Sequence, residues 1–142
     1  MQINILIRKG ARRAFIEAQI KFHIRHLKLE RSSYTLTVMT RKGQQAETGG
    51  RGVTGHQDKN IVICLDSGLA IYHLMMTVAH EMVHVKQIAR GQLRYEIVRG
   101  KEIIHWLGKR ADKLPYLKQP WELEAFARTE LMVRGLEELF KK

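Results

Sequence analysis

Three stretches of the chain place apolar residues at helical spacing. Over Ala11–Leu29 an apolar face lies opposite a face that is almost wholly basic, which predicts an amphipathic helix. Leu69–Ala79 is apolar with little interruption, and the pattern continues to Gly91, a residue suited to end a helix. Pro120 occupies the first-turn position that proline favours and opens a third amphipathic pattern that runs to the C-terminus. These stretches predict three helices, the second of them buried nearly all round.

Other stretches have the composition or the alternation of β-strands. Tyr34–Thr40 alternates and is rich in β-branched residues, and Asn60–Asp66 is mostly apolar, so we expect a strand in each. Leu93–Leu107 alternates on both sides of Arg99–Gly100, which predicts a β-hairpin. Gln2–Ile7 is short and apolar and is either an edge strand or the lead into the first helix.

Two polar stretches connect these elements. Arg41–Asp58 contains five glycines, which predicts a loop or a loose hairpin with a mobile tip, and loops of this length often border functional sites. Gly108–Gln119 is a polar connection to the last helix. We find no internal repeat and no second domain. The prediction is a single α+β domain over residues 1–142, with a small, mostly antiparallel sheet packed against the three helices.

Length and composition narrow the class of protein. A chain of 142 residues with 44% hydrophobic residues is large enough to bury a core. No uncharged apolar run reaches about 18 residues, so no membrane span is expected. The N-terminus places its apolar residues before its basic ones, the reverse of a secretory signal. Cys64 is the single cysteine, which excludes an internal disulfide and sites built from several cysteines. We therefore expect a cytoplasmic protein.

The net charge of +11 is unevenly distributed. Residues 1–60 contain 12 Lys and Arg against 4 Asp and Glu, a balance of +8, whereas residues 61–142 contain 13 against 10, a balance of +3. A basic N-terminal half suggests nucleic acid, an acidic protein or a membrane surface, of which we retain the first two as candidate partners. A solvated surface that keeps the protein in solution explains the charge equally well.

Residues 80–84 are His-Glu-Met-Val-His, the H-E-x-x-H pattern, within the second predicted helix. Side chains four residues apart lie on one face of a helix, so His80 and His84 can bind the same metal ion. Glu81 lies where zinc hydrolases place their general base. Buried polar groups without a partner cost about 1–3 kcal/mol each, and a metal ion gives this helix a reason to carry them. The alternative is a pair of core histidines satisfied by hydrogen bonds.

A catalytic zinc site usually has three protein ligands and one open position, so a third ligand is expected after this helix. Glu122 and Glu124 both lie in the first turn of the last predicted helix, where the helix dipole favours a carboxylate. Glu122 shares a face with Ala125, whose small side chain lets two helices approach closely, and we favour it over Glu124. His105, in the predicted hairpin, is a third candidate.

The sequence HEMVHVKQ, followed by PWELEAFA, resembles the small gluzincin-type zinc metallopeptidases, which include single-domain forms of phage and bacterial genomes. The resemblance covers about residues 60–135. It implies a minimal zincin-like fold, one zinc ion held by His80, His84 and Glu122, and an intracellular protein that phage genomes also encode. Several branches place Asp or Asn after the residue that matches Ala125, where it supports a zinc-binding histidine. Here that residue is Phe126, so a different acceptor must orient the histidine if Glu122 is the ligand.

A zinc-dependent endopeptidase acting on polypeptides is the leading expectation. Glu81 would be the general base toward a zinc-activated water, and Tyr116 and His105 are candidates for stabilising the oxyanion. The strand Asn60–Asp66 would bind substrate by β-addition if it lies at a sheet edge, or is an ordinary core strand.

Two alternatives accompany this expectation. NIVICLD, at residues 60–66, resembles the SprT-like proteases, which implies a protease that acts on DNA-associated proteins. Those proteases usually take their third ligand from a downstream histidine motif that this chain lacks. The other alternative is a basic binding protein in which zinc only stabilises the fold.

Overall fold

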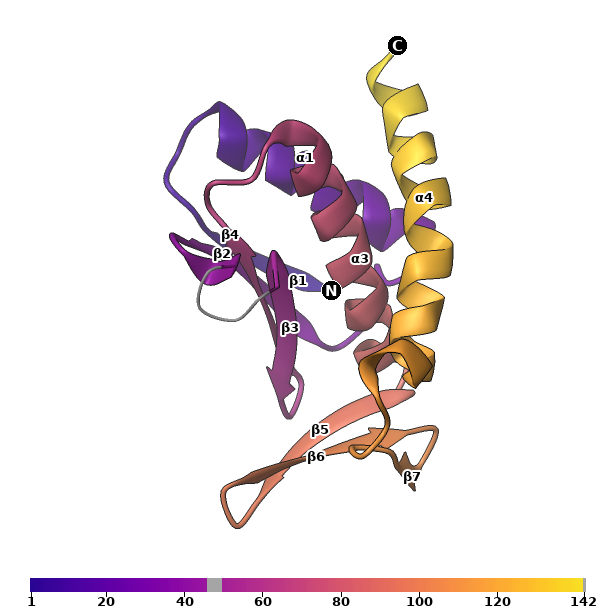
Figure 1. The fold of residues 1–142 in the computed structure, drawn as a ribbon. Helices are drawn as coiled ribbons and strands as arrows, with labels where there is room; N and C mark the ends of the chain where they lie inside the picture. Colours follow the sequence, from indigo (N-terminus) through magenta and orange to yellow (C-terminus); the bar gives the residue numbers. More distant parts are fainter. Residues whose placement is uncertain (46–49, 142) are drawn as a thin grey trace.

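The computed structural model describes residues 1–45 and 50–141, and the predicted α+β class is confirmed within them (Figure 1). The helices are α1 (Ala11–His26), α3 (Ile71–Ala89) and α4 (Pro120–Phe140), with a short 3-10 helix η1 (Tyr116–Lys118) before α4. The strands are β1 (Gln2–Leu6), β2 (Thr35–Arg41), β3 (Gly52–Gln57), β4 (Asn60–Asp66), β5 (Leu93–Val98), β6 (Lys101–Trp106) and β7 (Lys109–Arg110).

The sheet that packs against the helices has the strand order β1-β2-β4-β3. Its pairs β1–β2 and β2–β4 are parallel and only β3–β4 is antiparallel, so the prediction of a mostly antiparallel sheet is wrong. The parallel pairing has a topological cause. Helix α1 returns the chain to the starting end of the sheet before β2, and β3 lies beyond β4 rather than between β2 and β4. Strand β1 is at one edge of the sheet, as one of the two predictions for Gln2–Ile7 had it.

The stretch Arg41–Asp58, predicted as a loop or loose hairpin, contains the edge strand β3 in its second half. Asp58, at a positive φ of 51°, turns the chain from β3 into β4, so this part is a regular hairpin. The strand propensity of this segment is low, because it contains two glycines and several polar residues. Its conformation is determined by pairing with the buried strand β4. The predicted mobile tip falls partly on residues 46–49, which lie outside the described residues.

The hairpin predicted around Arg99–Gly100 is confirmed as β5–β6. Arg99 and Gly100 both have positive φ, 52° and 76°, as a two-residue turn of type I′ requires. Strand β7 adds a third, short strand, and this small sheet extends away from the helices (Figure 1).

Helix α1 buries a face that includes two polar side chains, Gln19 and His23. His23 is fully buried, although it belongs to a helix whose polar face is mostly basic, while His26 is exposed. The cause is the breadth of the buried face, which contains residues at i, i+3, i+4, i+7 and i+8 from Ile16. Burial lowers the pKa of His23 to about 4, with a smaller contribution from His26, so the ring is neutral.

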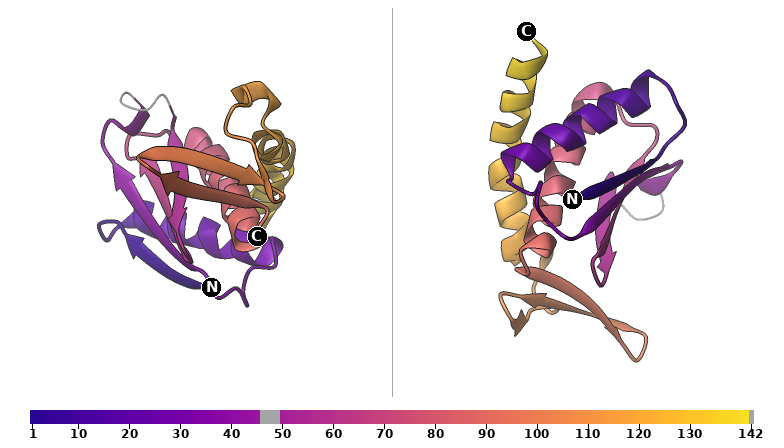
Figure 2. Two further views of the ribbon diagram at one scale, coloured as in Figure 1. Left: turned by 90° about the horizontal axis from the view of Figure 1, so that it is seen from below. Right: turned by 180° about the vertical axis from the view of Figure 1, so that it is seen from behind.

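Helix α3 is the centre of the core, with 13 of its 19 residues buried, as its apolar sequence predicts. Helices α1 and α3 lie on one face of the four-stranded sheet, and α4 packs along the side of α3 that faces away from the sheet (Figures 1 and 2). In the described part of the chain, none of the helices combines the length and the apolar content needed to cross a membrane.

Candidate metal centre

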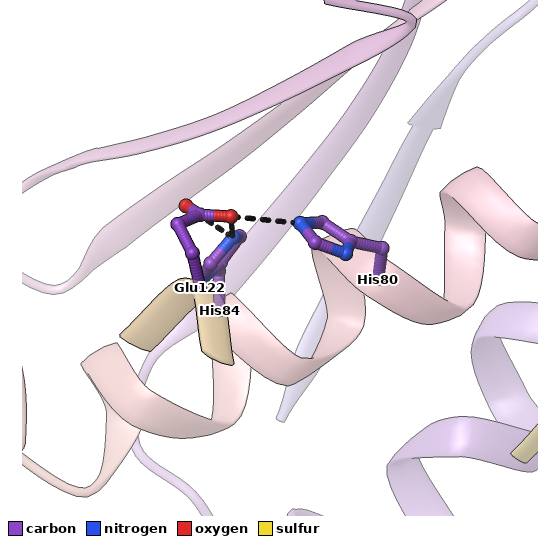
Figure 3. Close-up of side chains that lie close together, drawn as sticks. All are labelled: His80, His84 and Glu122. Atoms are coloured by element: carbon purple, nitrogen blue, oxygen red, sulfur yellow. Dashed lines mark hydrogen bonds and ion pairs between the residues drawn. The ribbon is translucent and has the colours of Figure 1, made fainter. Parts of the chain in front are cut away.

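His80, His84 and Glu122 converge at the contact between α3 and α4 (Figure 3). The two histidines lie one turn apart on α3, with their ring centroids 5.0 Å apart, and Glu122 reaches them from the first turn of α4. One ligand atom from each residue lies within 4.8 Å of the other two. The structure therefore brings together the three residues predicted as ligands, close enough to bind one metal ion.

The carboxylate of Glu122 meets both imidazoles at their Nε2 atoms. Glu122 Oε1 lies 2.9 Å from His80 Nε2, and Glu122 Oε2 lies 3.1 Å from His84 Nε2. Ligand atoms at about 2.0–2.1 Å from a tetrahedral zinc ion are about 3.3 Å apart, so these two separations are close to those of a zinc site. Two imidazole nitrogens and a carboxylate oxygen are also a donor set that zinc hydrolases use.

Gln87 fixes the orientation of the His84 ring. Its amide nitrogen donates to Trp121 O at 3.0 Å and to Glu124 Oε1 at 2.8 Å, so its amide oxygen must face His84 Nδ1, 2.9 Å away. Nδ1 therefore carries a proton, and when His84 is neutral this leaves the Nε2 lone pair for a metal ion at the cluster. This bond supplies the acceptor that Phe126 cannot provide.

The electrostatics of the cluster favour a cation. Burial would raise the pKa of Glu122, but the hydrogen bonds to His80 and His84 outweigh it and lower that pKa to about 2. For His84, burial works toward a lower pKa, but the hydrogen bond to Glu122 and the charge of Glu81 prevail and raise it. The rings of His80 and His84 thus both lie beside the negative charge of Glu122. A metal ion can take the place of a proton between an imidazole Nε2 and the Glu122 carboxylate.

Glu81 is buried between α3 and the edge strand β3. Thr54 of β3 donates to Glu81 Oε1 at 3.3 Å, and Gly52 lies so close that an added Cβ would be 3.1 Å from Glu81 Cγ. Burial raises the pKa of Glu81 and outweighs the opposing effects of His84 and His80. A carboxylate with a raised pKa beside a ligand cluster is suited to accept and return a proton.

Glu124, the alternative third ligand, points away from the cluster. Its carboxylate accepts from Lys86 Nζ at 2.7 Å and from Arg128 Nε at 3.1 Å, and it also accepts from Gln87. His105, the other candidate, lies on β6 and pairs with Glu96 of β5 at 3.1 Å. Neither residue belongs to the ligand cluster, which leaves Glu122 as the carboxylate that faces the histidines.

Tyr116 and Phe126 border the exposed side of the cluster. The Tyr116 hydroxyl donates to Glu122 Oε1 at 3.3 Å, and burial together with the charge of Glu122 raises its pKa to about 12. The Phe126 ring lies 4.9 Å from the His80 ring, centroid to centroid. Of the two oxyanion candidates, the structure brings Tyr116 to the cluster and leaves His105 on the hairpin.

Three residues of the site were not predicted: Gln87, Thr54 and Tyr95. Burial and the charges of Glu122 and Glu81 raise the pKa of the Tyr95 phenol, so this ring from β5 lies within the field of the site. Only Gln87 left a signal in the sequence, because it is a polar residue three positions after His84 on a helix otherwise predicted to be buried.

A hollow of about 770 Å³ opens beside His80. Its lining combines aromatic and apolar side chains with polar and charged ones, among them Tyr72, Met76, Tyr116, Phe126, Arg51 and Glu130. A second hollow, of about 750 Å³, lies beneath the β5–β6 hairpin and is lined by residues such as His56 and Tyr34, but by none of the three candidate ligands. The hollow at His80 is therefore the one that gives a ligand access to the cluster.

No known protein family, curated protein or solved structure matches this chain. The interpretation of the cluster therefore depends on its own geometry and chemistry.

Proposed function

We propose that this protein is a zinc-dependent endopeptidase. The observation that carries the proposal is the convergence of His80, His84 and Glu122 with a buried carboxylate, Glu81, directly beside them. Three protein ligands leave an open position, which a catalytic site needs and a purely structural site does not. When bound, zinc would supply Lewis acidity, which acidifies water and polarises a substrate carbonyl.

Residues of the chain would carry out proton transfer and stabilise the developing oxyanion. Glu81 would take a proton from the attacking water and deliver it to the amine nitrogen that leaves when the peptide bond breaks, which its raised pKa favours. Thr54 orients that carboxylate from β3. Tyr116, now bonded to Glu122, would donate to the oxyanion that develops on the carbonyl oxygen.

Strand β3, not β4, is suited to hold a polypeptide substrate. The predicted strand Asn60–Asp66 is confirmed as β4, but it lies between β2 and β3 and has no free edge. Among the described residues β3 pairs only with β4, so its outer edge is open beside Glu81. An extended peptide can pair with this edge, while the hollow at His80 receives one of its side chains.

The absence of a partner cysteine for Cys64 is the reason to propose a cytoplasmic setting.

Zinc analysis combined with digestion of an unbiased peptide library tests this proposal. We expect one zinc ion per chain, retention of zinc and loss of cleavage in Glu81→Gln, and loss of both in His84→Ala. Glu137→Gln, a change of the same type on the exposed side of α4, is the matched control and should retain both. Full activity of Glu81→Gln would exclude Glu81 as the base, and a chain without stoichiometric zinc would refute the metal assignment.

A further inference from the structure

A small hollow of about 210 Å³, separate from the candidate metal centre, lies where the end of α1 meets α3 and α4. Every polar side chain that lines it is basic. The lining residues are His26, Leu27, Lys28, Lys86, Arg90 and Arg128. Four of these side chains, the two lysines and the two arginines, are positively charged near neutral pH.

Within residues 1–45 and 50–141, the carboxylate bonded to these side chains is that of Glu124. Glu124 accepts from Lys86 Nζ at 2.7 Å and from Arg128 Nε at 3.1 Å, so two of the cations already converge on an oxyanion. One negative charge against four positive charges leaves an excess of three. This excess gathers around one concave site, where the positive charges act together on an anion.

The backbone at the end of α1 positions Arg90 and the main chain of Lys28. Arg90 Nη2 donates to Leu27 O at 2.8 Å, which ties α3 to the end of α1. Lys28 has a positive φ of 58°, and the amide of Leu29 donates back to Ile24 O at 2.8 Å. Glycine is the residue that adopts this conformation at least cost, yet the chain places a lysine at the rim of the hollow. Among the described residues, no partner is found for the Lys28 ammonium group.

We propose that this hollow binds a phosphate group. Arginine and lysine together are the side chains that recognise phosphate, arginine through paired N–H donors and lysine as a compact charge. Only the Nε of Arg128 is used by Glu124, so its terminal N–H groups remain available to a phosphate oxygen. The phosphate can be a free anion or the phosphodiester of a nucleic acid, and both present the same oxygens.

Titration of the full-length protein with inorganic phosphate, followed by isothermal calorimetry and amide NMR shifts, tests this site. We expect saturable binding, shifts centred on Lys28, Arg90 and Arg128, and the same result after a chelator has removed any metal. Arg128→Gln should weaken binding about tenfold, the contribution of one charge-assisted hydrogen bond. Arg134→Gln is the matched control, since Arg134 lies on the same helix in a similar i,i+4 ion pair, with Glu130, and does not line the hollow.

Lys28→Gln, two residues beyond the end of α1, and Lys21→Gln, on α1, form a second pair of test and control, because Lys21 is bonded to Glu17 and lies outside the hollow. A short oligothymidine distinguishes the two sources of phosphate. If the oligothymidine competes with phosphate and binds more weakly to Arg128→Gln, the ligand is a phosphodiester. If inorganic phosphate binds and the oligothymidine does not, the ligand is a free anion. Equal loss of affinity in Arg128→Gln and Arg134→Gln, binding that disappears on chelation, or no saturable binding would overturn the proposal.

Discussion

Gln87 is the side chain on which the orientation of His84 depends. It is fully buried, and its amide connects three partners: His84 Nδ1, the carbonyl of Trp121 and the carboxylate of Glu124. Two of these partners belong to α4, so the same amide that orients a histidine of α3 also holds the helix that carries Glu122. Residues that orient metal-binding histidines commonly affect metal affinity almost as strongly as the ligands themselves.

We expect Gln87→Met to lower zinc affinity about 10–100-fold, because His84 would lose the acceptor that sets its tautomer. Competition with a chromogenic chelator measures this change. Gln19→Met is the matched control, since Gln19 is also fully buried but has no hydrogen-bond partner for its amide. Equal zinc affinity in the two variants would show that Gln87 does not support the site.

His23 makes the stability of the fold depend on pH. Its ordinary pKa of 6.5 falls to about 4 in the folded protein, because burial disfavours the charged ring. Burial of the neutral His23 ring therefore contributes fully to the stability of the fold above pH 6.5. This contribution is lost as the pH falls through 6.5 toward 4. The free energy of unfolding should decrease by up to about 3 kcal/mol over this range on account of His23.

Urea unfolding of wild type and His23→Met at several pH values between 7 and 4 isolates this contribution, because the other titrating groups are common to both proteins. The variant should show the weaker pH dependence. His26→Met, on the exposed side of the same helix, should retain most of the pH dependence, because burial is the larger cause of the lowered pKa of His23. Parallel curves for wild type and His23→Met would contradict the assignment.

Strand β3 depends on one glycine to approach helix α3. A Cβ at Gly52 would lie 2.8 Å from Thr77 Cγ2 and 3.1 Å from Glu81 Cγ, so any side chain there must push the strand away from the helix. The same contact positions Thr54 against the Glu81 carboxylate. The close packing of this element is thus part of the geometry of the candidate base.

Gly52→Ala should lower the free energy of unfolding by about 1–3 kcal/mol, the usual effect of overpacking. Gly55→Ala, in the same strand, has no atom within 4 Å of the added methyl group and should be neutral or slightly stabilising. Chemical denaturation of the two variants compares them directly. Equal stability of both would show that β3 can move without strain.

How far sequence reasoning reaches differs between elements. The motif helix, the hairpin at Arg99–Gly100 and the last helix were predictable, because periodicity, turn residues and a first-turn proline are local signals. Strand β3 and the parallel pairing were not, since both follow from long-range packing against β4. That His80, His84 and Glu122 lie close together was predictable from spacing along α3 and from helix packing around Ala125. The contacts of Gln87 and Thr54 required the fold, because they join elements far apart in sequence.

For the molecule as a whole, a metal ion at the cluster would connect α3 to α4 and so join the core to the end of the chain. Zinc at a hundredfold excess over its dissociation constant should stabilise the protein by about 2.7 kcal/mol, because only the folded state brings the three ligands together. Thermal unfolding with zinc and with chelator measures this difference. Glu122→Gln should abolish most of the dependence of the melting temperature on zinc. If wild type melted at the same temperature with zinc and with chelator, the expected stabilisation by zinc would be contradicted.

The open side of β3 has a consequence for how the protein behaves at high concentration. Val53 of this strand is 48% exposed. A free strand edge beside an exposed apolar side chain can pair with any extended chain, including β3 of another copy of the protein. Two molecules that meet through Gly52–Gln57 would form one continuous sheet, and each would occlude the other's approach to Glu81. For the proposed peptidase, turnover per molecule should then rise on dilution, because crowding favours the pair in which both sites are blocked.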